Sequence, residues 1–427
     1  MRRLISLCLT FISLTLLASC SKINTIHTNL SSDSSQTDSA SSTAVSEVTH
    51  DIPIIPIENN NAELSSDKLI RIAFGGDTFM DMVFAEYSDL YGVDYPWSDI
   101  APVFNNSDIG FVNLETSVSR NGESLKREGY GFRTSPDKLE GYKNAGISIV
   151  SGANNHIQDY GAISLTDTMK HLDTYKISYT GIGNNLGEAR RPVFFESEGI
   201  RVGFLAYTEI IPFQSWTATD NTAGFCGITN ETLPLYLEDI KKYDAQCDIL
   251  IVSVHWGIEH TQKITNYQQE LAHKFIDSGA DMILGHHPHV LQPIEFYKEK
   301  PIFYSLGNLL FLKQDDFAGR TAVFRAEFNK DGFVSAKMFP VYIKACKANM
   351  LSEDSLLYNN ILANMSEISA QFGTGISKYG EITPFPCDNP PVYIKEPDDS
   401  SDNSGDNQNS FPDIEYNNLP ETVDLYE

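Results

Sequence analysis

Basic side chains are scarce in this 427-residue sequence. Lys and Arg together number 31, against 57 Asp and Glu, which leaves a formal net charge of -26 at pH 7. A protein this acidic repels a phosphate backbone, so the composition argues against nucleic acid as a partner. It repels an anionic polymer for the same reason, unless metal ions reverse the field locally.

The N-terminal apolar run is too short for a stable membrane span. Residues 1–20, MRRLISLCLTFISLTLLASC, combine two basic residues with a short apolar stretch and small residues, which is typical of an export signal. The segment Leu17 to Cys20 resembles a bacterial lipobox, with Cys20 as the lipidated residue. A plain secretory signal is the alternative. We therefore expect an extracytoplasmic protein, anchored to the cell membrane as a lipoprotein.

Cysteine is sparse as well, with six in the chain. Besides Cys8 in the signal and Cys20, the sequence contains Cys226, Cys247, Cys346 and Cys387. Their spacing resembles no zinc knuckle. Four cysteines in an oxidising compartment permit two disulfides. Free buried thiols are the alternative, since a domain this large folds without covalent crosslinks.

The two ends of the chain lack large apolar residues. Residues 21–66 are rich in Ser, Thr and Asn, and residues 388–427 are acidic, with the stretch EPDDSSDNSGDNQNS free of basic residues. Such segments bury too little surface to offset their ordering entropy, which predicts a disordered tether and a disordered tail. The structured domain is then expected over residues 67–345, with a C-terminal extension over residues 346–387. We find no internal repeat.

Short apolar runs alternate with helical patterns inside this domain. Strands are predicted at 69–76, 109–115, 147–153, 202–208, 248–257 and 281–287, and helices at 161–175, 232–245 and 266–278. This alternation is typical of an α/β domain with mostly parallel strands. After Pro301, three β-rich runs follow without a long helix, which predicts antiparallel strands that complete a second sheet.

Five predicted strands end in side chains that bind metals or move protons. These are Asp77, Asn113 with Glu115, Asn154 to His156 with Asp159 shortly after, His255, and His286 to His289. The carboxyl ends of parallel strands meet at one edge of a sheet, so we expect these groups to lie close together. Each alone has an ordinary structural explanation, such as a helix cap for Asp77 or core packing for Trp256. Together they form a mixed nitrogen and oxygen set that suits Zn, Mn or Fe.

Three histidines occupy four positions in the segment GHHPHV. In His287-Pro288-His289, alternate residues can face the same side while the proline restricts the backbone, so two imidazoles are aimed at one place. His286 then points elsewhere or contacts a ligand residue.

These motifs, in this order, resemble the CapA family of bacterial capsule-synthesis or poly-gamma-glutamate-biosynthesis proteins, within the metallophosphatase (calcineurin-like phosphoesterase) superfamily. The resemblance covers about residues 69–312. It rests on GGD at Asp77, NLE from Asn113 to Glu115, NNHxxDxG from Asn154 to Gly161, HWGxE from His255 to Glu259, GADxxxGHHPHVxQ from Gly279 to Gln292, and YSLGN from Tyr304 to Asn308.

The resemblance implies a four-layer αββα sandwich, in which two mixed sheets are flanked by helices and the site lies on loops between them. It also implies one or two divalent ions, Mn, Fe or Zn. The implied metal ligands are Asp77, Glu115, Asn155, His255, His287 and His289. The implied catalytic residues are His156, and Asp159 if it orients His156 rather than serving as a helix-start charge. The implied outer-shell or substrate residues are Asn113, Asn154, Trp256, Glu259, His286 and Asn308.

The sequence departs from the superfamily at two positions. Phe79 occupies the place of a usual histidine, and Glu115 stands where a bridging aspartate is expected. A first site that lacks one imidazole binds its metal more weakly, which leaves one ion or two as alternatives.

Three functions remain open at this level. The first is a membrane-anchored protein of capsule or poly-gamma-glutamate synthesis or export, with capsule-synthesis membrane proteins as partners and a metal-dependent phosphoesterase-like site. The second is a general extracellular phosphoesterase that acts on envelope or nucleotide phosphoesters. The third is a scaffold of a capsule assembly complex that binds metal or polymer without turnover.

Overall fold

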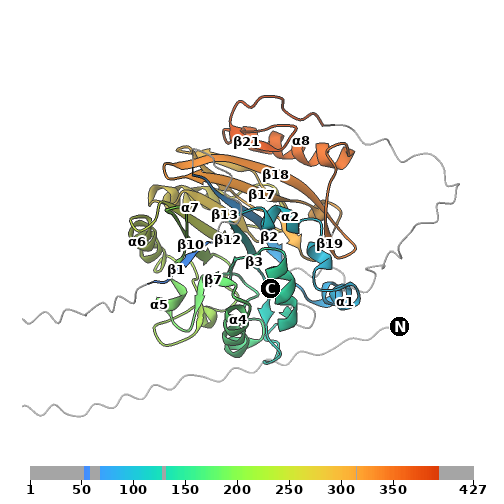
Figure 1. The fold of residues 1–427 in the computed structure, drawn as a ribbon. Coiled ribbons are helices and arrows are strands. Elements are labelled where there is room, and N and C mark those ends of the chain that lie inside the picture. Colours follow the sequence, from blue (N-terminus) through green and yellow to red (C-terminus); the bar gives the residue numbers. More distant parts are fainter. Residues whose placement is uncertain (1–51, 58–67, 127–130, 314, 394–427) are drawn as a thin grey trace, which may run out of the picture. The chain divides into compact units, whose positions relative to one another are not determined.

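The structure is a computed structural model that describes residues 52–57, 68–126, 131–313 and 315–393 (Figure 1). The predicted signal, Cys20, most of the predicted tether and nearly all of the predicted tail lie outside these residues. The four described cysteines, Cys226, Cys247, Cys346 and Cys387, are free thiols. None of the helices in the described ranges has the length and apolar character needed to cross a bilayer.

One mixed sheet has seven strands, and we call it sheet A. Its strands β10, β12, β13 and β15 run parallel, while β9 and β14 pair antiparallel with them. The order is β1 (Ile54–Pro56), β9 (Val193–Ser197), β10 (Ile200–Thr208), β12 (Ile249–His255), β13 (Met282–His286), β15 (Lys300–Phe303) and β14 (Ile294–Tyr297). Strand β1 pairs with β9, so the prediction of a disordered tether is wrong for residues 54–56.

The second sheet, sheet B, has ten strands. Strands β2, β3, β6, β7 and β16 are parallel, whereas β17 pairs antiparallel with both β2 and β18. The order is β20 (Thr374–Ile376), β21 (Glu381–Pro384), β18 (Gly332–Lys344), β17 (Arg320–Asn329), β2 (Ile70–Thr78), β3 (Ile109–Leu114), β6 (Ile149–Ser151) and β7 (Ser178–Thr180), with β16 (Asn308–Leu310) beside β2 and β19 (Lys347–Met350) beside β18.

The prediction for the chain after Pro301 is partly wrong. Strands β17 and β18 are antiparallel as expected, but they extend the sheet that already holds β2. The run PIFYSLGNLLF, which the sequence presents as one strand, is split between β15 in sheet A and β16 in sheet B. Gly307 separates the two halves at a φ of 66°, a conformation that glycine adopts without the strain that a side chain causes there.

Helices flank both sheets. They are α1 (Met82–Tyr91), α2 (Ala101–Asn105), α3 (Leu139–Asn144), α4 (Gly161–Tyr175), α5 (Leu186–Ala189), α6 (Leu233–Asp244), α7 (Asn266–Asp277) and α8 (Leu356–Ala370). The three predicted helices correspond to α4, α6 and α7. Helix α7 begins where a capping box forms, because Thr265 and Gln268 bond each other's backbone N–H groups. Two small sheets complete the fold: β4 (Ser117–Val118) with β5 (Arg133–Thr134), and β8 (Ile182–Gly183) with β11 (Gly224–Phe225).

Three apolar cores define the layers. The inner core lies between the sheets, where Ile72 and Phe74 of β2 pack with Val202 of β10 and Ile251 of β12. A second core joins sheet B to α2, α3 and α4, and a third joins sheet A to α6 and α7. In Figure 1, α6 and α7 lie beside the strands of sheet A, and α8 lies beside β18 and β21. The predicted four-layer αββα sandwich of two mixed sheets is therefore confirmed.

Candidate metal centre

The strand register places the predicted site residues of neighbouring strands beside one another. Asp77 of β2 is in register with Asn113 of β3 and with Asn308 of β16, and in sheet A His255 is in register with His286. The approach of β16 to β2 requires glycine, since a Cβ at Gly76 would lie 1.8 Å from a carbonyl oxygen. The prediction of one sheet edge is thus corrected: the cluster forms where the strand ends of two facing sheets meet.

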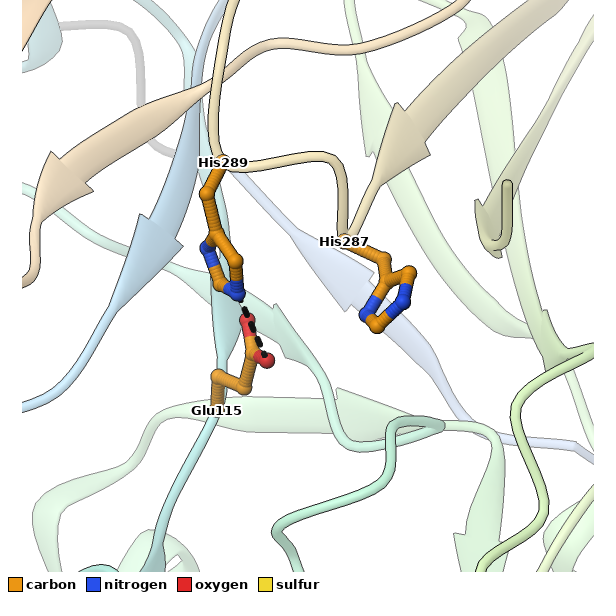
Figure 2. Close-up of side chains that lie close together, drawn as sticks. All are labelled: Glu115, His287 and His289. Atoms are coloured by element: carbon orange, nitrogen blue, oxygen red, sulfur yellow. Dashed lines mark ion pairs between the residues drawn. The ribbon is translucent and has the colours of Figure 1, made fainter. Parts of the chain in front are cut away.

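Glu115 is the carboxylate that both candidate ligand groups share. One group consists of Glu115, His287 and His289, and the other of Asp77, Glu115 and His255, each with ligand atoms within 4.8 Å of one another. Glu115 Oε1 lies 3.5 Å from His255 Nε2 and 3.8 Å from His289 Nε2. Figure 2 shows Glu115 and His289 approaching each other, with the His287 ring beside them. This arrangement suits the predicted bridging role of Glu115.

Asn113 ties the two carboxylates together. Its Nδ2 donates to Asp77 Oδ1 at 2.8 Å and to Glu115 Oε2 at 3.2 Å. Its Oδ1 accepts from Asn154 Nδ2 at 3.0 Å, and Asn154 Oδ1 in turn accepts from the backbone N–H of His156 at 3.1 Å. Both asparagines therefore hold candidate ligand and catalytic residues in place, and their outer-shell role stays a prediction.

The two buried carboxyl groups differ in proton affinity. Burial raises the pKa of Asp77, but hydrogen bonds and charge from His286 and His289 lower it more, to well below its usual range. Burial raises the pKa of Glu115 well above its usual value, and the negative charges of Asp77 and Glu259 raise it further. Without a cation, Asp77 therefore ionises more readily than an ordinary aspartate, and Glu115 keeps its proton to a higher pH than an ordinary glutamate.

His255 faces the amide oxygen of Asn155. Its Nε2 lies 2.8 Å from Asn155 Oδ1, and its Nδ1 lies 3.4 Å from Asn113 Nδ2. Because the Asn155 oxygen is an acceptor, the proton lies on Nε2 in the absence of a cation. Burial, followed by the charge of His287, lowers the pKa of His255 well below its usual value, so the ring is neutral. Neutral imidazole is the form that binds metals.

His289 is oriented for metal binding by two acceptors. Its Nδ1 lies 2.9 Å from Asn308 Oδ1 and 3.3 Å from Asp77 Oδ2. Since both oxygens are acceptors, Nδ1 carries the proton, and the unprotonated Nε2 faces Glu115. Burial lowers the pKa of His289, but the hydrogen bond and charge of Asp77 raise it above its ordinary value. A ligating histidine commonly donates its other N–H to such a partner.

The backbone of the histidine loop is strained. His287 and His289 have φ values of 94° and 58°, in a region that residues with side chains rarely adopt. The backbone N–H of His287 donates to Asp77 Oδ2 at 3.3 Å. Strain of this kind concentrates at binding sites, where the surrounding structure maintains it. The segment therefore aims both rings at the cluster, as the sequence predicted.

His286 turns back into the inner core. Its ring is fully buried, contacts Phe111, and places Nδ1 3.2 Å from Asp77 Oδ1. It thus supports Asp77, in line with its predicted outer-shell role. His287 is also buried, and burial lowers its pKa to about 3, with the charge of His289 as the next cause.

His156 and Asp159 form a pair beside the cluster. Asp159 is fully buried, and its Oδ2 lies 2.7 Å from His156 Nδ1 and accepts from the backbone N–H of Phe132 at 2.9 Å. Burial and the charge of Lys126 lower the pKa of His156 by more than Asp159 raises it. The alternative in which Asp159 is only a helix-start charge does not fit these contacts, since its carboxylate holds the imidazole.

Trp256 and Glu259 belong to the same HWGxE motif but lie in different places. Trp256 packs in the core between sheet A and its helices, and its indole N–H donates to the Tyr304 carbonyl at 2.8 Å. It is therefore a core residue and no part of the site. Glu259 lies at the margin of the cluster, with Oε1 3.9 Å from His287 Nε2 and Oε2 3.7 Å from His260 Nε2.

Sequence reasoning missed four residues around the cluster. Phe132 stacks on His156 and Phe311 stacks on His289, with ring centroids 4.2 and 4.6 Å apart. Lys126 contacts Asp159, and the backbone N–H of His260 donates to the Pro288 carbonyl. None belongs to a repeated or strand-end motif. The glycine-bounded loop around Lys126 and the YSLGN segment before Phe311 were the available signals.

An aromatic cluster surrounds Phe79, the position at which the resemblance leads us to expect a histidine. Phe79 is fully buried, and its ring centroid lies 4.7 Å from that of Phe311, 5.0 Å from that of Phe132 and 5.7 Å from that of Phe84. Phenylalanine donates no ligand atom, so this side of the centre is apolar.

The donor set fits a divalent cation. Glu115 Oε1 and His287 Nδ1 are buried without a hydrogen-bond partner among the described residues. Such atoms cost free energy unless something compensates them. Carboxylate, imidazole and the amide oxygen of Asn155 together match the preferences of Mn, Fe or Zn, and they include no thiolate that would indicate a structural zinc site.

These observations define the class of protein: a four-layer αββα domain whose facing sheets hold a buried histidine and carboxylate centre, the architecture expected of a metallophosphatase-like protein. The family described as bacterial capsule synthesis protein PGA_cap matches residues 71–313. The chain belongs to this family.

Curated relatives agree with the family. The chain is 28% identical over 315 residues to the PGA biosynthesis protein CapA of Bacillus subtilis, covering 73% of this chain and 82% of that protein. It is 33% identical over 242 residues to the capsule biosynthesis protein CapA of Bacillus anthracis, covering 55% of this chain and 58% of that protein. The match therefore spans little more than half of the Bacillus anthracis protein.

Solved structures resemble the chain distantly. The NAD nucleotidase of Haemophilus influenzae is 13% identical with a TM-score of 0.38, and the alignment covers 71% of this chain and 64% of that one. A protein of Thermus thermophilus is 9% identical with a TM-score of 0.35, and the alignment covers 67% of this chain and 99% of that one.

Proposed function

We propose that this protein is an extracytoplasmic lipoprotein, anchored through Cys20, that acts in the synthesis or export of a capsule or poly-gamma-glutamate polymer. Its site is a divalent-metal-dependent hydrolytic site of the phosphoesterase type. Family membership and the names of the Bacillus relatives support the polymer assignment. Membrane proteins of capsule synthesis are its proposed partners.

One observation carries the proposed chemistry. Glu115 Oε1 faces His255 Nε2 at 3.5 Å on one side and His289 Nε2 at 3.8 Å on the other. Glu115 would hold a divalent cation together with either neighbouring group, Asp77 with His255 or His287 with His289. A bound divalent cation supplies Lewis-acid polarisation of the substrate.

The chain's own residues supply orientation and proton transfer. Asp159 holds Nδ1 of His156 at 2.7 Å, which leaves Nε2 as the ring atom that exchanges a proton with the reacting oxygen. The contact with Asp159 keeps the ring oriented while His156 holds the extra proton. Phe132 stacks on the His156 ring and limits its rotation.

The proposed function is tested by phosphodiester hydrolysis in vitro and by polymer production in a deletion strain. The full chain, loaded with Mn²⁺, is expected to hydrolyse bis-p-nitrophenyl phosphate, and His156→Asn is expected to lower kcat by about 10²–10⁴-fold. In a deletion strain, the wild-type gene is expected to restore the polymer and the His156→Asn gene is not. Full restoration by His156→Asn would indicate a scaffold. Turnover without any polymer defect on deletion would indicate a general phosphoesterase.

The anchor has a separate test. Mass spectrometry of the membrane fraction is expected to show Cys20 as the modified N-terminal residue. A Cys20→Ser variant is expected to appear in the soluble extracytoplasmic fraction. An unmodified Cys20 in the membrane fraction would contradict the anchor.

A further inference from the structure

Lys126 places an ammonium group beside His156. Its Nζ lies 3.2 Å from Asp159 Oδ1 and 3.3 Å from His156 Nδ1, and its side chain is only 16% exposed. The segment is fixed next to Asp159, since the backbone N–H of Leu125 donates to the Asp159 carbonyl at 2.8 Å. Lysines are seldom this covered, so Lys126 differs from an ordinary solvated surface charge.

The hydrogen bonds of Asp159 leave Lys126 with unused donors. Asp159 Oδ2 is taken by His156 Nδ1–H and by the backbone N–H of Phe132. Because His156 Nδ1 carries that proton, it cannot also accept from Lys126. An ammonium group has three donors, and the ion pair of Lys126 Nζ with Asp159 Oδ1 at 3.2 Å includes no hydrogen bond. Among the described residues, the N–H groups of Lys126 are therefore available to a ligand.

The charge of Lys126 acts on the metal cluster as well. Burial raises the pKa of Glu115, and the charge of Lys126 partly offsets this; burial lowers the pKa of His156 and His287, and the charge of Lys126 adds to this. Its positive charge has the sign that attracts an anion bound beside the cluster. It also cancels the charge of Asp159, which would otherwise repel an anion next to His156.

We propose that Lys126 is the residue that admits an oxyanion of the substrate, phosphate or carboxylate, beside His156. This inference rests on the proposed function and names the chemistry that its substrate must present. An acidic protein that acts on an anionic substrate needs such a cation at the point of contact.

The test measures binding of simple probes to the full chain loaded with Mn²⁺. Isothermal titration with inorganic phosphate and with γ-glutamylglutamate distinguishes the two oxyanions. Lys126→Gln is expected to weaken binding of the preferred probe by about tenfold or more, the size of one partly buried charged contact. The matched control is Lys170→Gln, because Lys170 is 75% exposed on α4 and pairs with Asp167 at 3.8 Å. Equal affinities in the wild type and Lys126→Gln would overturn the proposal.

Two further variants test the mechanism. Lys126→Gln combined with Asp159→Asn removes both charges and is expected to bind the probe more tightly than Lys126→Gln alone. A double variant as weak as the single one would contradict the cancellation of charge. If Lys126→Gln does not fold, Lys126→Arg replaces it: retention of binding within about threefold is expected, and a loss beyond tenfold contradicts the proposal.

Probe binding and phosphodiester hydrolysis, measured on the same proteins, test the role of Lys126 and the proposed hydrolytic function separately. A protein that binds either probe through Lys126 but does not hydrolyse a phosphodiester contradicts the hydrolytic site and supports the role of Lys126. A protein that hydrolyses the diester with unchanged KM in Lys126→Gln contradicts the role of Lys126 alone.

Discussion

His289 Nδ1 lies 2.9 Å from Asn308 Oδ1, and this contact joins the two sheets at the metal centre. His289 follows β13 of sheet A, and Asn308 opens β16 of sheet B. Asn308 Nδ2 is held by the carbonyls of Leu312 and Ala318, each at 3.3 Å, so its oxygen must face the imidazole. The amide therefore fixes the tautomer that leaves His289 Nε2 available as a ligand.

Asn308→Ala is expected to lower metal affinity about 10–100-fold, because an outer-shell partner that orients a ligand is lost. Competition with a chromophoric chelator measures the affinity. Asn144→Ala is the control, since the Asn144 amide contacts the exposed Asp94 far from the cluster. Equal affinity in Asn308→Ala and Asn144→Ala would exclude the orienting role.

Glu115→Gln is expected to abolish near-stoichiometric metal retention while making the metal-free protein more stable at pH 8. The pKa of Glu115 in the folded protein is raised above its ordinary value of 4.5. Its contribution to stability is therefore present below that value and is lost as pH rises through the folded pKa. Thermal unfolding of both metal-free proteins at pH 5 and pH 8 tests this. A difference in Tm that does not grow with pH would contradict it.

Metal binding is expected to release protons near neutral pH. Burial raises the pKa of Glu115, and the contact with Asp77 raises that of His289, so both groups compete with the cation for protons. Affinity should then increase as pH rises toward 8. Titration calorimetry in buffers of different ionisation enthalpy counts the protons, and a heat independent of the buffer would contradict the expectation.

His287→Gly is expected to be more stable than His287→Ala, by about 1 kcal/mol. Both variants remove the imidazole, but alanine must adopt the φ of 94° found at this position, whereas glycine does so without strain. Urea denaturation of the metal-free variants measures the difference. A glycine variant less stable than the alanine variant would show that the loop relaxes its backbone.

Trp256→Phe is expected to lower the free energy of unfolding by about 1–3 kcal/mol, because the buried Tyr304 carbonyl loses its donor. Metal content should not change, since the indole lies in the core outside the centre. Loss of metal in a folded Trp256→Phe protein would restore the site role that the HWGxE motif suggested.

Sequence patterns within one segment predicted the features that depend on residues close together in the sequence. The helical pattern over residues 161–175 matches α4, because its periodicity and flanking glycine are properties of the segment itself. The strand-end motifs likewise predicted that Asp77, Glu115, His255 and His289 lie close together, and the structure places them in two candidate ligand groups.

Contacts between distant segments could not be predicted in the same way. Nothing in the apolar run of β12 shows that it belongs to a different sheet from β3, because both are buried on two faces. Lys126 and Phe132 both contact the pair of His156 and Asp159, which lies about 25 to 35 residues further along the chain. Trp256 follows the candidate ligand His255 yet faces the opposite side. Alternation of side chains along a strand explains that last difference.

The most direct test of the metal centre is metal content, measured by inductively coupled plasma mass spectrometry on the full chain and on Asp77→Ala and His287→Ala. The wild type is expected to retain near-stoichiometric Mn, Fe or Zn, and each variant is expected to lose it while remaining folded by circular dichroism. A wild-type protein that retains no divalent metal, even after reconstitution with each ion, would contradict the metal centre.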